Sequence, residues 1–142
     1  MTEYDAVFKK FLKNIKDYDF LLINEAHLQE LYVDLLESSI SDFEICLKDL
    51  NDRDDVLSRF NVDLTPQEIE ILALGMTMHW LYPQVMNTDL LRNSLNTKDY
   101  TTFSPSNLLD KMTTLFNNTE KRFTSKMNLY SYRHGDIEAL TE

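Results

Sequence analysis

The side chains best suited to catalysis or metal binding in this 142-residue sequence are three histidines and one cysteine. His27, His79 and His134 lie far apart, and none has companion ligands at the short spacings that zinc sites use. His79 stands in an apolar segment, where a hydrogen-bonded core histidine is more common than a metal ligand. Cys46 has no evident partner base that would activate a thiol nucleophile. These four residues therefore favour structural roles over a catalytic or metal site.

A run of acidic residues from 49 to 55 has the composition of a calcium-binding loop but not its spacing. Asp49, Asn51 and Arg53 fall at the first, third and fifth loop positions, and Arg53 has the wrong charge for a ligand. No glycine occupies the sixth position, and Phe60 stands where the bidentate glutamate is needed. We therefore expect a solvated loop.

Other catalytic patterns are also missing from the sequence. The two glycines are 60 residues apart, so there is no glycine-rich phosphate loop, and no serine stands in a nucleophile elbow. Paired carboxylates are plentiful, but they fall on what would be the exposed face of a helix, where their ionisation should be ordinary. The sequence predicts a non-enzymatic protein with no catalytic residue, no metal and no cofactor.

The composition favours helices over strands. The chain has 22 Leu against five Val, with two Gly and three Pro, and leucine keeps more rotamer freedom in a helix than valine does. Its length fits a single domain, residues 1–142. We predict an all-α fold, an elongated bundle of four to five helices with two long helices and a proline-kinked central helix.

Apolar residues at helical spacing place these helices along the chain. Thr65 and Glu68 form a capping box around Pro66, which predicts a helix that begins at residue 66. Pro83 should end or kink that helix, and Gly135 should break the last one. The expected helices span residues 3–15, 24–50, 66–82, 84–95 and 105–128, and the expected mobile tail spans residues 130–142.

Charge is distributed unevenly along the chain. The net charge is −10; residues 1–70 carry 17 acidic and seven basic side chains, whereas residues 71–142 carry seven of each. An acidic protein is a poor candidate for binding nucleic-acid phosphates, and opposed charged surfaces favour association between subunits. An acidic surface that serves only solubility is the alternative. The candidate acidic interface or channel residues are Glu30, Asp34, Glu37 and Glu44, and the candidate basic interface residues are Lys121, Arg122 and Lys126.

Two aromatic residues and a cation stand near the C-terminal end of the sequence. Tyr130, Tyr132, Arg133 and His134 follow the predicted end of the last helix. Aromatic side chains at such positions often anchor on a neighbouring protein, because they bury much area at low entropic cost. A segment that folds back on its own core is an equally good interpretation.

Four stretches of the sequence carry a family resemblance. They are residues 11–22 (FLKNIKDYDFLL), 47–74 (LKDLNDRDDVLSRFNVDLTPQEIEILAL), 80–98 (WLYPQVMNTDLLRNSLNTK) and 130–136 (YSYRHGD). In this order they resemble the small helical head–tail connector proteins of tailed bacteriophages, the adaptor or neck family. The most specific parts mark fold and assembly rather than catalysis.

The resemblance implies a structural protein of the virion neck, made in the host cytoplasm. About a dozen copies would form an adaptor ring that joins the portal of the head to the tail, and DNA would pass through the ring without specific binding. The implied partners are further copies of the chain, the portal protein and the next neck or tail-completion protein, with no membrane. Tyr130, Tyr132, Arg133 and His134 would dock on the portal, and the acidic residues would meet the neighbour's bases or line the channel.

A second class of protein fits the same composition. An acidic helical protein of this size could mimic the charge of DNA and inhibit a nuclease or repressor in the infected cell. The acidic residues would then need a spacing close to that of phosphates over an exposed surface, and the predicted stripe from residue 30 to 44 could provide it.

Overall fold

The computed structural model describes residues 1–15, 28–95 and 105–141, with side chains described for residues 1–15, 30–87 and 110–133. Within these residues the chain forms four helices and a small three-stranded sheet. The helices are α1 (Tyr4–Ile15), α2 (Leu28–Asp42), α3 (Pro66–Leu95) and α4 (Pro105–Thr141), and the strands are β1 (Thr2–Glu3), β2 (Arg53–Asp54) and β3 (Arg59–Phe60). The predicted, mostly helical class is confirmed, whereas the sheet was not predicted.

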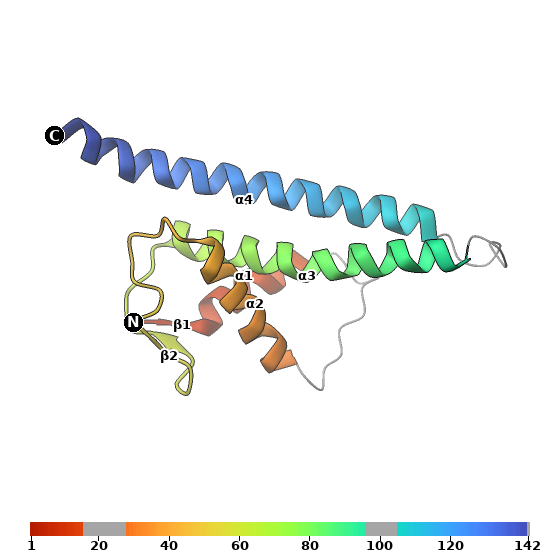
Figure 1. Ribbon diagram of the computed structural model, residues 1–142. Helices are drawn as coiled ribbons and strands as arrows, with labels where there is room; N and C mark the ends of the chain where they lie inside the picture. The colour runs from red at the N-terminus through yellow and green to blue at the C-terminus, as the bar shows by residue number, and fades with distance from the viewer. Residues whose placement is uncertain (16–27, 96–104, 142) are drawn as a thin grey trace.

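α3 is the central helix of the fold, because α1, α2 and α4 all pack against it. Figure 1 shows α4 (blue) running antiparallel along one side of α3 (green), with α1 and α2 on the other side. The sheet lies at the end of the molecule where α3 begins. The 37 residues of α4 span roughly 55 Å at 1.5 Å per residue, so α3 and α4 form a long helical hairpin.

The core lies where α1, α2 and the first half of α3 meet. The ring of Phe11 contacts the rings of Tyr32 and Trp80 edge-on, with centroids 5.8 Å and 6.2 Å apart. This one side chain therefore joins α1 to both α2 and α3. The buried residues of α1 recur at steps of three and four, as predicted: Tyr4, Val7, Phe8, Phe11 and Ile15.

The small sheet is built around β3. Phe60 of β3 pairs with Thr2 of β1 on one side and with Arg53 of β2 on the other, and both pairings are antiparallel. The Phe60 side chain is fully buried, and its ring lies edge-on to that of Tyr4 with centroids 5.0 Å apart. Strands of two residues leave no alternating pattern in the sequence, which explains why the sequence indicated only a solvated loop in this region.

α2 ends at Asp42, so its predicted continuation to Leu50 is wrong. The last five residues of α2 include three serines, which are weak helix formers. The N–H of Phe43 is shared between carbonyls three and four residues back, as at many helix ends. The Phe43 side chain is buried in the core, and Glu44 lies in the loop that follows α2. The predicted start at residues 24–27 lies outside the described residues.

α3 continues through Pro83 to Leu95, so the predicted division into two helices is wrong. A proline inside a helix costs about 3 kcal/mol, because it lacks an N–H and crowds the preceding turn. Packing on both sides compensates here. Leu81 is fully buried in the core, and the ring of Tyr82 contacts Phe116 of α4 with centroids 5.8 Å apart. Pro83 itself is exposed, so its ring occupies no space in the core.

α4 continues through Gly135 to Thr141, so its predicted end near Asn128 is also wrong. Tyr130 is 1% exposed, which fixes the helix against the core beyond that predicted end. One glycine in a helix costs only about 1 kcal/mol, and this is too little to break a helix that is fixed so close by. Residues 130–141, which belong to the predicted mobile tail 130–142, are the last turns of α4.

Candidate functional site

Three of the predicted acidic residues share one exposed side of α2. Glu30, Asp34 and Glu37 follow one another at steps of four and three residues, so they lie on the same side of the helix. We call these three residues the acidic face. Glu44 is also exposed, but it stands in the loop after α2 and does not continue this face.

The predicted basic residues lie together on α4. Lys121 and Arg122 are exposed and Lys126 is almost so, and we call the three the basic ridge. Glu70 of α3 lies 3.9 Å from the Arg122 guanidinium and 3.8 Å from the Lys126 ammonium. Exposed ion pairs at such separations contribute little stability. The basic ridge therefore remains a positive surface that faces solvent.

Tyr130 belongs to a buried hydrogen-bond cluster that joins three parts of the chain. Its hydroxyl donates to Glu68 Oε2 at 2.7 Å and accepts from the N–H of Leu47 at 2.9 Å. The Cys46 thiol donates to the same carboxylate at 3.4 Å, and the N–H of Thr65 donates to Glu68 Oε1 at 2.8 Å. The return bond, from the N–H of Glu68 to Thr65 Oγ1 at 3.2 Å, confirms the predicted capping box. The cluster fixes α4 and the loop after α2 to the start of α3.

Ionisation in this cluster is set by burial and by these hydrogen bonds. Burial disfavours the charged form of Glu68, but the N–H of Thr65, the Tyr130 hydroxyl and the Cys46 thiol stabilise it and hold the pKa of the carboxyl below its usual range. Burial, together with the neighbouring carboxylate, raises the pKa of Cys46 to about 11. The thiol is therefore protonated near neutral pH and acts as a hydrogen-bond donor rather than as a nucleophile.

The lowered pKa of Glu68 predicts a specific pH dependence of stability. A carboxyl with a lower pKa in the folded state stabilises the fold above its unfolded pKa, and this contribution is lost as pH falls. Glu68→Gln should therefore lower the free energy of unfolding at neutral pH. The difference in this free energy between variant and wild type should shrink below about pH 4.5, the ordinary pKa of a glutamate carboxyl. Urea unfolding at a series of pH values measures this. A difference that stays constant down to pH 3 would contradict it.

The four residues predicted to form a docking segment do not form one surface. Tyr130 points into the core, where its ring packs edge-on against Phe43 with centroids 5.1 Å apart. Tyr132 is 68% exposed and Arg133 is also exposed. His134 lies on α4, and its side chain is outside the described residues. The exposed part of the predicted docking segment is therefore limited to Tyr132 and Arg133 among the residues whose side chains are described.

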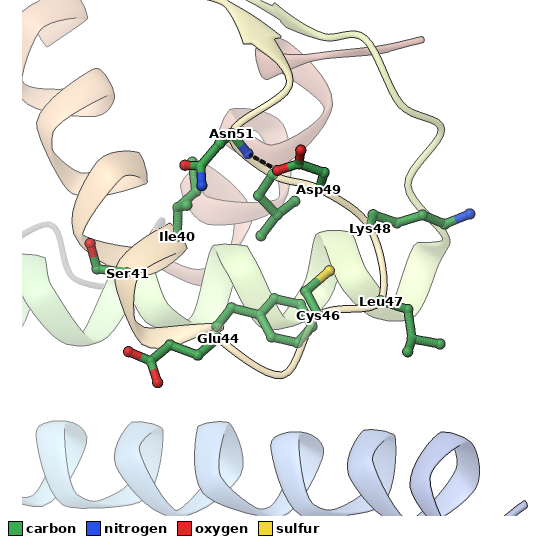
Figure 2. Close-up of a pocket in the computed structure, with 10 residues that line it drawn as sticks. Ile40, Ser41, Glu44, Cys46, Leu47, Lys48, Asp49 and Asn51 are labelled. Atoms are coloured by element: carbon green, nitrogen blue, oxygen red, sulfur yellow. Dashed lines mark hydrogen bonds between the residues drawn. The ribbon is translucent and has the colours of Figure 1, made fainter. Parts of the chain in front are cut away.

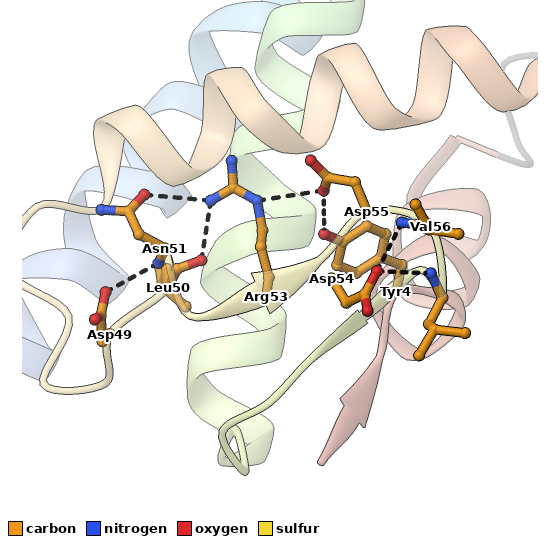
Figure 3. Close-up of polar contacts among 9 residues, drawn as sticks. Tyr4, Asp49, Leu50, Asn51, Arg53, Asp54, Asp55 and Val56 are labelled. Carbon is orange, nitrogen blue, oxygen red and sulfur yellow. Dashed lines mark hydrogen bonds and ion pairs between the residues drawn. The ribbon is translucent and has the colours of Figure 1, made fainter.

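A second exposed feature is the turn between β2 and β3, which sequence reasoning missed. The turn carries Val56, 93% exposed, and Leu57, 55% exposed. Asp54 Oδ1 accepts the N–H groups of both residues, at 2.9 Å and 3.0 Å. Such bonds are one reason why aspartate favours turns, so the two aspartates that precede Val56 and Leu57 were the available signal. Figure 3 shows this turn with its hydrogen bonds.

A shallow hollow of about 600 Å³ lies beside the loop that follows α2. Figure 2 shows the residues that line it, which include Phe43, Cys46 and Leu47 alongside Glu44 and Lys48. Apolar and charged side chains both line its wall, and the Cys46 thiol donates its hydrogen bond to Glu68.

In the part of the chain that the structure describes, no three His, Cys, Asp or Glu side chains are grouped closely enough to hold a metal ion. His79 is half-buried, and its Nε2 lies 2.5 Å from Asp42 Oδ2, so it is a hydrogen-bonded histidine between α3 and the end of α2. His27 lies outside the described residues. None of the described helices is apolar over a stretch long enough to cross a membrane.

Comparison with known proteins gives no match for this chain. No family model, no curated protein and no solved structure matches it. The charged and apolar surfaces described above are therefore the observations from which its function is inferred.

Proposed function

We propose that this chain is a structural subunit of a phage head–tail connector and that it assembles into a ring. The observation that supports this most strongly is the placement of charge. One molecule carries an acidic face on α2 and a basic ridge on α4, and these helices lie on different sides of α3 (Figure 1). The sequence resemblance supplies the setting, a ring between the portal and the next neck or tail-completion protein.

Two different surfaces that attract each other produce a repeating contact. When a surface on one copy binds a different surface on the next, the contact is heterologous, and it closes into a ring if the rotation per subunit allows. Glu30, Asp34 and Glu37 of one copy would face Lys121, Arg122 and Lys126 of its neighbour. Opposite charge orients the two copies during encounter and penalises like-charged pairings.

The remaining negative charge suits a channel for DNA. Residues 71–142 carry no net charge, so the whole net charge of −10 comes from residues 1–70. A negative wall repels phosphates and lets DNA pass without specific binding. The portal and the next neck protein would contact the two rims of the ring.

Charge reversal tests the proposed ring. Lys121→Glu with Arg122→Glu should weaken self-association by about tenfold or more, because two attractive pairs at each contact become repulsive. Adding Asp34→Lys and Glu37→Lys to the same chain should restore association. Native mass spectrometry of the purified full-length chain measures the oligomers, and circular dichroism checks that each variant is folded.

The matched control reverses two charges elsewhere. Lys9 and Lys10 are exposed on α1, so Lys9→Glu with Lys10→Glu changes the net charge equally without touching the proposed contact. Equal association of the basic-ridge variant and the wild type would contradict the contact, and it would favour an acidic face that lines the channel instead.

A further inference from the structure

The turn between β2 and β3 presents two apolar side chains on a backbone that is already fixed. We call Asp55, Val56, Leu57 and Ser58 the hairpin tip. Val56 is 93% exposed and Leu57 is 55% exposed, so the tip places two adjacent apolar side chains in water, where a partner that covered them would gain by burying apolar area. Neither side chain reaches the core of its own chain, so both stay in water unless a partner covers them.

Several hydrogen bonds hold the hairpin tip in place. The Tyr4 hydroxyl donates to Asp55 Oδ1 at 2.5 Å, and Arg53 Nε lies 3.5 Å from the same atom. The N–H of Tyr4 donates to the carbonyl of Ser58 at 2.9 Å, where the chain takes a φ of 53°. Asp54 caps the two N–H groups between them. A turn fixed in this way loses little conformational entropy on binding.

A complementary surface lies on the last described part of α4. Arg122, Lys126, Leu129 and Arg133 follow one another at steps of four, three and four residues, so they share one side of the helix, and Tyr132 lies next to Leu129. Leu129 is 40% exposed and Tyr132 is 68% exposed. These apolar side chains therefore lie among three cations. We call Leu129, Tyr132 and Arg133 the receptor patch.

Charge on the two surfaces is opposite. Residues 49–63, which contain the hairpin tip, carry five acidic and two basic side chains, whereas residues 111–133 of α4 carry five basic and one acidic. Burial raises the pKa of the Tyr4 hydroxyl most, and the carboxylates of Asp55 in the tip and Glu37 on the acidic face of α2 raise it further, so both carboxylates act on the same tyrosine. An apolar tip with an acidic border thus matches an apolar patch with a basic border.

The two surfaces cannot meet within one molecule. Figure 1 shows the sheet and α4 on different sides of α3. We propose that the hairpin tip of one copy docks on the receptor patch of a second copy, with Val56 and Leu57 against Leu129 and Tyr132. This inference rests on the proposed ring and defines the apolar centre of its contact. It places Tyr132 and Arg133 in the contact between neighbouring copies of the ring. The resemblance instead implies that these two residues dock on the portal.

Disulfide trapping in the full-length chain tests this contact. A chain with both Val56→Cys and Tyr132→Cys should give a ladder of covalent oligomers under mild oxidation. An equimolar mixture of the two single variants should give dimers only, since each chain then has one cysteine at the contact. Neither single variant alone should cross-link. The parent chain, whose Cys46 thiol is half-buried and has a raised pKa, measures the background.

A second cysteine pair, placed away from the proposed contact, is the control. Leu12 is an exposed apolar residue of α1, so Val56→Cys with Leu12→Cys should give no ladder. Dimers from the Val56→Cys variant alone, or no ladder from the double variant at any concentration, would overturn the contact. Incorporation into virions without cross-linking would remove only this inference. Cross-linking by a protein that never enters virions would remove only the proposed connector function.

Discussion

Tyr130→Phe should lower the free energy of unfolding by about 2–3 kcal/mol, although it removes a single oxygen atom. The lost hydroxyl leaves the Glu68 carboxylate without its 2.7 Å donor and the N–H of Leu47 without its 2.9 Å acceptor. Glu68 is 1% exposed, so water cannot replace the lost donor without a rearrangement. The phenylalanine ring retains the contact with Phe43, so hydrogen bonding rather than packing accounts for the loss.

A second tyrosine on the same helix provides the control for that substitution. Tyr132 is 68% exposed, so Tyr132→Phe should change the free energy of unfolding by less than about 0.5 kcal/mol. Urea unfolding of both variants and the wild type under one set of conditions gives the comparison. Equal losses in the two variants would show that the Tyr130 hydroxyl has no special role.

Gly75→Ala should be destabilising by about 1–3 kcal/mol, even though alanine is the better helix former. Gly75 lies where α2 and α4 both approach α3. A Cβ atom there would stand 2.1 Å from Ser39 Oγ and 3.2 Å from the ring of Phe123. Ser39 Oγ donates to the carbonyl of Leu72 at 2.7 Å in a buried position, so moving it would break that bond. The added methyl group must therefore push α2 away or disrupt the bond.

A double-mutant cycle isolates this close approach. Ser39→Ala removes the hydroxyl that the new Cβ would meet, so Gly75→Ala should cost clearly less in the Ser39→Ala background than in the wild type. Thermal and urea unfolding measure all four proteins of the cycle. Additive effects of the two substitutions would contradict the predicted clash.

Local signals in the sequence predicted the features that local chemistry controls. Thr65 and Glu68 form the expected capping box, and α3 begins at Pro66 as predicted. The apolar spacing of α1 correctly identified its buried face. These features depend on residues within a few positions of one another, which is the range over which spacing and capping rules apply.

Helix ends that depend on distant contacts could not be predicted in this way. The proline rule predicted that Pro83 ends or kinks its helix, and the last helix was predicted to end at residue 128. Contacts with Phe116 and Glu68 instead stabilise both helices beyond these points. Helical spacing up to Leu50 extended α2 too far, because the pairing of Leu47 with Tyr130, 83 residues away, was not visible in the sequence. Tertiary packing prevailed over local propensity in each case.

The candidate surfaces were predicted in part. Spacing alone placed three acidic residues on one side of α2 and three basic residues together on α4. It could not separate Tyr130, which is buried, from Tyr132, which is exposed, because that distinction depends on where α3 lies. The hairpin tip was missed because Val56 and Leu57 follow no helical or alternating pattern, and only the fold fixes them in solvent.

Quantitative mass spectrometry of purified virions of the phage that encodes this chain tests the proposed function most directly. The chain should be a particle component at a ring-like copy number, roughly level with that of the portal protein. A chain that is abundant in the lysate but absent from particles would contradict the connector function. Its acidic surface would then be better explained as a decoy for DNA-binding proteins of the infected cell.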